Sequence, residues 1–164
     1  MCGIAGFIAP ASPRDADWLR ARGRAMADAI VHRGPDDGDI WVDAAAGLAL
    51  AHRRLSILDL SPAGHQPMQS ASGHYVLAFN GEIYNHLYLR GMLDAQTWRG
   101  HSDTETLLAC IEAWGIEITL TRLTGMFAFA LWDKNKRELV LARDRLGEKP
   151  LYYVWQGDVF LFGS

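Results

Sequence analysis

The chain begins with Met1-Cys2-Gly3-Ile4-Ala5-Gly6-Phe7, and the fold is best read outward from this stretch. Small and β-branched residues fill positions 2–8, which predicts a buried strand with a cysteine at its start. If Met1 is removed, Cys2 becomes the chain terminus, and its thiol and α-amine then sit on the same carbon atom. An α-amine has an unperturbed pKa of about 7.7–8, so part of it is a free base at neutral pH. Such an amine can act as the base for its own side chain without a histidine partner.

The composition predicts one globular domain. The chain has 164 residues, of which 49% are hydrophobic and 21% are charged. Sixteen basic and nineteen acidic residues give a net charge of -3, which argues against nucleic acid or a membrane surface as the partner. Two cysteines are too few for a secreted disulfide scaffold. Because no signal peptide or membrane-length apolar run is present, we expect a cytoplasmic protein.

One long helix is expected soon after the opening strand. Ser12-Pro13-Arg14-Asp15 predicts its start, with a capping hydroxyl, a proline at the first helical position and an acid in the first turn. The glycines, proline and acids of residues 32–38 predict a loop after it. Apolar residues recur at three- and four-residue steps to about Val31, at Trp18, Ala21, Ala25, Met26, Ala29 and Ile30.

Strands joined by short turns make up most of the remainder. Asn80-Gly81 is typical of a tight hairpin turn, here between strands 75–79 and 82–84. Ser102-Asp103-Thr104-Glu105 is a capping box and predicts a helix that turns Leu107, Leu108, Ile111 and Trp114 inward. Because strands joined by short turns are antiparallel, we expect an α+β fold of antiparallel sheets covered by helices. The other expected elements are strands 40–42, 48–52, 126–132, 138–143, 151–155 and 159–162, and a helix over 85–94.

Further motifs continue the opening stretch along the whole chain. They are His32-Arg33-Gly34-Pro35-Asp36-Asp37, Ala51-His52-Arg53-Arg54-Leu55-Ser56-Ile57, Gln66-Pro67-Met68, Phe79-Asn80-Gly81-Glu82-Ile83-Tyr84-Asn85, Ser102-Asp103-Thr104-Glu105, residues 125–130 and residues 142–153. In this order, the set resembles the class II glutamine amidotransferases and, within them, the asparagine synthetase branch. These proteins are N-terminal-nucleophile hydrolases. The resemblance therefore implies a four-layer αββα sandwich, with two antiparallel sheets between helices.

The resemblance implies three catalytic residues. Cys2 would be the nucleophile, while the Asn80 side-chain amide and the Gly81 backbone N–H would stabilise the oxyanion. The dipeptide by itself favours a simple tight turn, and both readings can hold together. Cys110 lies among apolar helix positions and is interpreted as a small buried apolar group.

The resemblance also implies a set of residues that bind glutamine. Arg54 resembles the family's carboxylate-binding arginine, and its neighbour Arg53 would face the opposite side of a strand. Asp103 corresponds to the acid that binds the substrate ammonium, and Glu82 lies in the same binding set. From the residues alone, Arg54 could be a solvated charge and Asp103 a favourable acid at a helix N-terminus. Backbone groups of Ile57 and Leu58 match the family's glutamine-contacting segment.

Two further features are placed without a role. Residues 33–36 are expected to form a loop near the pocket, and Trp98, Arg99 and His101 depart from the commoner family pattern. The six histidines and two cysteines show no paired ligand spacing, so neither a metal nor another cofactor is expected in this domain. A thiol redox protein would need a Cys-x-x-Cys pair, which the sequence lacks.

The resulting functional expectation is a glutaminase domain over residues 1–164 that hydrolyses L-glutamine to glutamate and ammonia. The resemblance implies that an ATP-dependent synthetase domain, using ATP and Mg²⁺, follows in the parent protein and receives the ammonia. Its acceptor could be aspartate or a different carboxylate, such as a sugar acid. The competing hypothesis is a catalytically silent module that binds glutamine or a partner protein. A homodimer is compatible with either.

Overall fold

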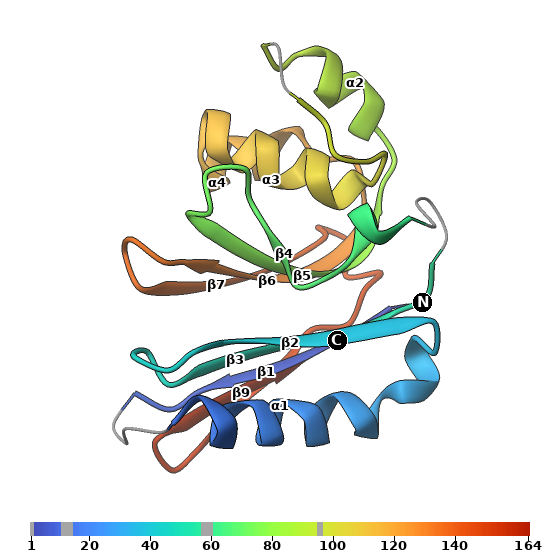
Figure 1. Cartoon of the computed structure of the whole chain (residues 1–164). Coiled ribbons are helices and arrows are strands. Elements are labelled where there is room, and N and C mark those ends of the chain that lie inside the picture. The colour runs from blue at the N-terminus through green and yellow to red at the C-terminus, as the bar shows by residue number, and fades with distance from the viewer. Residues whose placement is uncertain (1, 11–14, 57–60, 95–96) are drawn as a thin grey trace.

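The computed structural model of the chain has two β-sheets stacked face to face, with helices on their outer faces (Figure 1). The structure describes residues 2–10, 15–56, 61–94 and 97–164. Ile57 and Leu58 of the expected glutamine-contacting segment, and Ser12–Arg14 of the expected helix start, lie outside the described residues.

The first sheet has five antiparallel strands in the order β2-β3-β1-β9-β8. Small residues in β1 let it lie between β3 and β9, and Gly6 is so close to Phe162 that a Cβ there would lie 2.3 Å from the ring. Helix α1 packs on the outer face of this sheet, against β1, β2 and β3 (Figure 1). The elements are β1 (Gly3–Ile8), α1 (Ala16–Ala29), β2 (Asp37–Asp43), β3 (Leu48–Arg54), β8 (Tyr152–Gln156) and β9 (Val159–Gly163).

The second sheet has four antiparallel strands in the order β4-β5-β6-β7 and carries helices on its own outer face (Figure 1). Its elements are β4 (Met68–Gln69), β5 (Tyr75–Ile83), α2 (His86–Gly91), α3 (Asp103–Trp114), α4 (Ile116–Arg122), β6 (Gly125–Asp133) and β7 (Glu138–Arg143). Two short 3-10 helices, η1 (Val31–Arg33) and η2 (Pro62–Gly64), lie in the connections. The expected α+β sandwich of two antiparallel sheets between helices is thus confirmed. Helix α4 was not expected.

Alternation along the strands separates two cores. Leu77, Phe79 and Phe129 face the helices and pack with Leu107 and Ile111 of α3. Val76, Ala130 and Trp132 point the other way and pack between the sheets against Leu48 and Leu50. Even-numbered residues of β5 therefore face the other sheet, and this places Asn80 between the two layers. No helix among the described residues has the length and apolarity that crossing a membrane requires.

The expected hairpin at Asn80-Gly81 is wrong. Strand β5 runs without a break through both residues, with Asn80 opposite Ala128 and Gly81 opposite Phe127. A Cβ at Gly81 would lie 2.3 Å from the carbonyl oxygen of Met126. The glycine is needed for close approach to β6, so a pairing between distant segments overrides the local turn signal.

The expected start and apolar stripe of α1 also need correction. Asp15 is the N-cap, since its side chain accepts a hydrogen bond from the Trp18 backbone N–H at 2.7 Å. The buried face is made by Leu19, Gly23 and Ala27, whereas the alanines at positions 21, 25 and 29 are exposed. A Cβ at Gly23 would lie 2.8 Å from Ile40, so the glycine lets the helix approach the sheet closely.

Candidate active site

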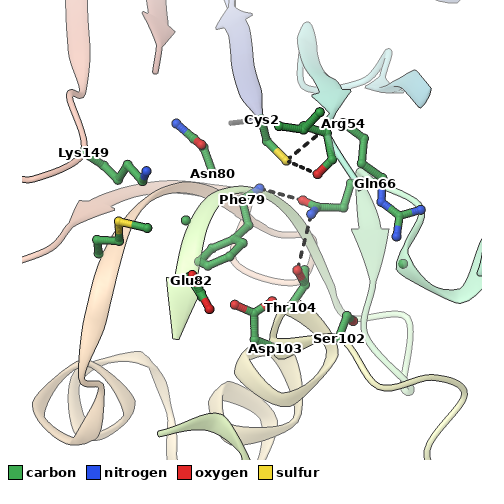
Figure 2. A pocket seen from close by; sticks show the side chains of 14 residues that line it. Cys2, Arg54, Gln66, Phe79, Asn80, Glu82, Ser102, Asp103, Thr104 and Lys149 are labelled. Atoms are coloured by element: carbon green, nitrogen blue, oxygen red, sulfur yellow. Dashed lines mark hydrogen bonds between the residues drawn. The ribbon is translucent and has the colours of Figure 1, made fainter. Parts of the chain in front are cut away.

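A pocket opens between the two sheets where β1 begins and α3 starts (Figure 2). It brings together Cys2, which immediately precedes β1, and residues from β3, β5, β6 and α3. Its lining is formed by Cys2, Arg54, Leu55, Gly64, Gln66, Phe79, Asn80, Gly81, Glu82, Ser102, Asp103, Thr104, Met126 and Lys149. The pocket therefore contains every expected site residue except Ile57 and Leu58, which are outside the described residues.

Cys2 lies at the N-terminal end of β1, and backbone contacts fix it there. Its thiol donates to the carbonyl oxygen of Leu55 at 3.6 Å and accepts from the Leu55 N–H at 3.4 Å. Arg33 donates to the Cys2 carbonyl oxygen at 3.2 Å. The half-buried sulfur thus has a defined position at the pocket wall, and residue 33 of the expected neighbouring loop holds it.

The remainder of that loop also supports the pocket wall. The Asp36 carboxylate accepts from the Ser56 N–H at 2.8 Å, and Pro35 forms a bridge with Arg54. At Gly34, a Cβ would lie 2.4 Å from the carbonyl carbon of Arg53, so only a glycine allows this close approach. The expectation that residues 33–36 lie near the pocket is confirmed.

The edge of β5 is open in front of Cys2 because β4 pairs with β5 only at Val76 and Leu77. Beyond that point, side chains replace a neighbouring strand. The Phe79 N–H donates to Gln66 Oε1 at 2.7 Å, and the Ile83 N–H donates to Asp103 Oδ2 at 2.8 Å. Successive N–H groups of a strand alternate between its two edges, so the Gly81 N–H points to this same edge, into the pocket.

A buried histidine forms a hydrogen bond with the Phe79 carbonyl group, which lies on the same open edge of β5. His52 is fully buried, and its Nε2 lies 3.0 Å from the Phe79 carbonyl oxygen. Burial lowers the pKa of His52 to about 4, so the ring is neutral at pH 7 and Nε2 carries the donated proton. Together with Gln66, His52 fixes the backbone immediately before Asn80.

Asn80 links the two sheets at the pocket. Its side chain is 1% exposed and its Nδ2 donates to the Ser164 hydroxyl at 2.9 Å. Ser164 in turn exchanges two backbone hydrogen bonds with Ile4 of β1. A carboxamide nitrogen carries two hydrogens, so the contact with Ser164 orients the second one. The Asn80 amide and the Gly81 backbone thus line the same pocket as the Cys2 sulfur.

The two adjacent arginines of β3 separate as alternation predicts. Arg53 turns outward to α1, where its Nε donates to the Ala27 carbonyl oxygen at 3.2 Å and its Nη2 pairs with Asp28. Arg54 is buried, lines the pocket and donates to the Ser61 carbonyl oxygen at 3.2 Å. Strand geometry alone therefore puts a cation in the pocket and another on the opposite face of the sheet.

Two carboxylates lie on the α3 side of the pocket. Asp103 is 4% exposed at the first turn of α3, and burial raises its pKa. Glu82 lies close to Asp103 in the pocket (Figure 2). The predicted cap of this helix is confirmed, since Ser102 accepts from the Glu105 N–H at 3.2 Å. Asp103 thus lines the pocket, and its bond with the Ile83 N–H joins α3 to β5.

The loop around Trp98 forms a clamp behind that helix start. Arg90 stacks over Trp98 at 3.9 Å and donates to the carbonyl oxygens of Gly100 and Ser102 at 3.0 and 3.2 Å. The Glu105 carboxylate accepts from the Arg99 and Gly100 N–H groups at 2.8 and 3.0 Å. Trp98 and Arg99 are not among the residues that line the pocket. The segment 98–101, which departs from the commoner family pattern, therefore packs behind the pocket.

Several pocket residues occur in the quoted motifs but received no role from the sequence. Gln66 reaches from the loop before β4 to Thr104 Oγ1 at 3.3 Å, and Lys149 and Met126 also line the pocket. The presence of Gln66 and Lys149 within the quoted motifs was the available signal. Among the described residues, no group of three or more His, Cys, Asp or Glu side chains is placed to hold a metal ion.

Two antiparallel sheets between helices, with a cysteine at the start of a central strand, are the architecture of the N-terminal-nucleophile hydrolases. The chain belongs to a family of glutamine amidotransferase domains, because the family model of that description matches residues 1–164. A solved structure supports the fold: the glutamine phosphoribosylpyrophosphate amidotransferase from B. subtilis has a TM-score of 0.77 over 98% of this chain and 41% of that chain, at 21% identity.

The chain is also similar in sequence to several proteins of known name. Asparagine synthetase [glutamine-hydrolyzing] 2 of Bacillus subtilis is 42% identical over the whole of this chain and 21% of that protein. Putative asparagine synthetase [glutamine-hydrolyzing] 2 of Methanocaldococcus jannaschii is 37% identical over the whole of this chain and 34% of that protein. Amidase chry2 of Gibberella zeae is 38% identical over 93% of this chain and 24% of that protein. The chain therefore spans a fifth to a third of the length of these relatives.

Proposed function

We propose that this domain hydrolyses L-glutamine to L-glutamate and ammonia, with Cys2 as the N-terminal nucleophile. The observation that carries the proposal is the pocket itself. A thiol, a side-chain amide and an inward-pointing backbone N–H meet at one place, between a buried guanidinium and two carboxylates. This arrangement suits an amide substrate that also carries one negative and one positive charge.

Binding follows from charge. Arg54 pairs with the α-carboxylate, for which its planar fork of donors is suited. Asp103 and Glu82 pair with the α-ammonium on the opposite side of the pocket. Glutamine held by both ends presents its side-chain carboxamide to the Cys2 sulfur, with the carbonyl oxygen toward Asn80 and Gly81.

The chemistry requires removal of Met1, which frees the α-amine of Cys2. The thiol proton moves to this amine, and the thiolate attacks the carboxamide carbon to form a C–S bond. The negative charge moves to the carbonyl oxygen, where the Asn80 amide and Gly81 N–H donate to it. Collapse breaks the C–N bond, and the proton held by the α-amine passes to the departing ammonia. Water then attacks the thioester, releases glutamate and restores the thiol.

In the parent protein, we propose that the ammonia is passed to an ATP- and Mg²⁺-dependent synthetase domain that amidates a carboxylate. The names of the asparagine synthetase relatives support this role. Aspartate is the acceptor we propose on that ground. The further proposal of a cytoplasmic location rests on the same relationship.

The test is to compare wild type with Cys2→Ala and with Cys110→Ala, by measuring glutamate release and the mass of the N-terminus. Cys110 is fully buried in α3, and burial raises its pKa to about 11, so it is a matched cysteine without thiolate chemistry. We expect Cys2→Ala to lose turnover while Cys110→Ala keeps it. Glutaminase activity in Cys2→Ala would refute the mechanism. Glutamine binding without hydrolysis by a wild type lacking Met1 would instead support the silent binding module.

A further inference from the structure

Lys149 is a buried cation on the pocket wall, on the same side of the pocket as Asn80 in Figure 2. Its side chain is 2% exposed, although lysine is among the residues that are least often buried. In Figure 2 it extends into the pocket from the side of Asn80, whereas Arg54 lies on the far side of the Cys2 sulfur. The reaction proposed above gives this residue no part.

A rigid turn delivers Lys149 to this position. The Asp144 carboxylate accepts hydrogen bonds from the N–H groups of Glu148 and Lys149, each at 2.9 Å. It also accepts from the Phe127 N–H at 3.2 Å, while the Asp144 N–H donates to the Phe127 carbonyl oxygen at 2.8 Å. Phe127 is the residue opposite Gly81 in the β5–β6 pairing. The backbone of Lys149 is thereby tied to the scaffold that carries Gly81.

The charges of the pocket suggest what the lysine is for. Among the described residues, the charged side chains that line it are the cations Arg54 and Lys149 and the carboxylates Glu82 and Asp103. The α-carboxylate of glutamine accounts for Arg54, and its α-ammonium accounts for the two acids. The reaction creates one further negative charge, on the oxygen of the carboxamide. Lys149 is the cation on the side of Asn80, where that charge develops.

We propose that Lys149 is a further catalytic residue of the glutaminase site, whose ammonium stabilises the oxyanion together with Asn80 and Gly81. This inference rests on the proposed function. Lys149 takes no part in the proton transfer, so the proton path from thiol to α-amine to ammonia is unchanged. A fixed charge in a water-poor pocket stabilises an oxyanion more strongly than a neutral donor does, and it needs no reorganisation during the reaction.

The test compares wild type, Lys149→Met and the control Lys136→Met, which changes an exposed lysine in the β6–β7 turn. Removal of one neutral oxyanion donor costs about 100- to 1,000-fold in kcat, so we expect the loss of the charged donor to cost at least about 100-fold. The KM for glutamine should stay within about twofold of wild type. The aldehyde analogue of glutamine forms a tetrahedral adduct with a thiol, so its inhibition constant should rise by the same factor as kcat falls.

The outcomes separate this inference from the proposed function. An unchanged kcat in Lys149→Met, with an active wild type and an inactive Cys2→Ala, would overturn the role of Lys149 and leave the glutaminase assignment standing. A raised KM with an unchanged kcat would also overturn it, because the lysine would then serve substrate binding. A wild type without glutaminase activity would refute both. If Lys149→Met does not fold, Lys149→Gln is expected to show the same loss of kcat.

Discussion

Replacing Gln66 with leucine removes the side chain that takes the place of a neighbouring strand at the open edge of β5. Gln66 is 5% exposed, accepts from the Phe79 N–H at 2.7 Å and donates to Thr104 at 3.3 Å. Leucine is of similar volume, so the packing is retained while the Phe79 N–H loses its partner. A buried donor left without a partner costs about 1–3 kcal/mol. For a protein of this size, that free energy lowers Tm by about 2–12 °C.

The same change should affect catalysis, because Phe79 directly precedes the residues proposed to bind the oxyanion. A displaced donor loses part of the roughly 100- to 1,000-fold that a complete donor supplies, so we expect kcat to fall at least about tenfold. Thermal unfolding and glutamate release measure the two effects. The variant Gln66→Glu distinguishes the two hydrogen bonds of this side chain. It keeps an acceptor for the Phe79 N–H and removes the N–H group that Gln66 donates to Thr104.

The matched control is Gln69→Leu, which alters an exposed glutamine three residues further along, in β4. This variant should match wild type in both Tm and kcat. If Gln66→Leu also matches wild type in both measurements, the backbone edge of β5 does not depend on side-chain partners, and the reasoning is refuted.

Two further predictions concern Asp103 and His52. In Asp103→Asn the amide oxygen can still accept from the Ile83 N–H, so the fold should persist. The KM for glutamine should rise about 10- to 100-fold, because a hydrogen bond to a charged group contributes about 1.5–3 kcal/mol. An unchanged KM would exclude Asp103 from ammonium binding. Burial lowers the pKa of His52 from 6.5 to about 4, so the unfolded chain binds the extra proton first. The stability contributed by neutral His52 is therefore complete above pH 6.5 and decreases as the pH falls toward 4. In His52→Gln the free energy of unfolding should fall less over that range than it does in wild type. Denaturant titrations at pH 4 and 7 measure this difference. The same fall in both proteins would contradict the pKa assigned to His52.

The sequence by itself determined the features that depend on local pattern. The small residues after Cys2 form the predicted strand, and the Ser102 hydroxyl caps α3 as its motif indicates. The alternation of a strand also predicted that Arg53 and Arg54 face opposite sides, and both contacts bear this out. These features need only neighbouring residues and the period of a helix or strand.

The tertiary structure decided the features that depend on distant segments. Asn80-Gly81 has the local signature of a turn, yet pairing with β6 keeps it extended and aims the Gly81 N–H into the pocket. The apolar pattern of α1 did not show that Gly23 would face the sheet, because the close contact with Ile40 is made across the fold. Gln66 and Lys149 became pocket residues for the same reason. Each is far from Cys2 in sequence, and only the stacking of the two sheets brings them to one site.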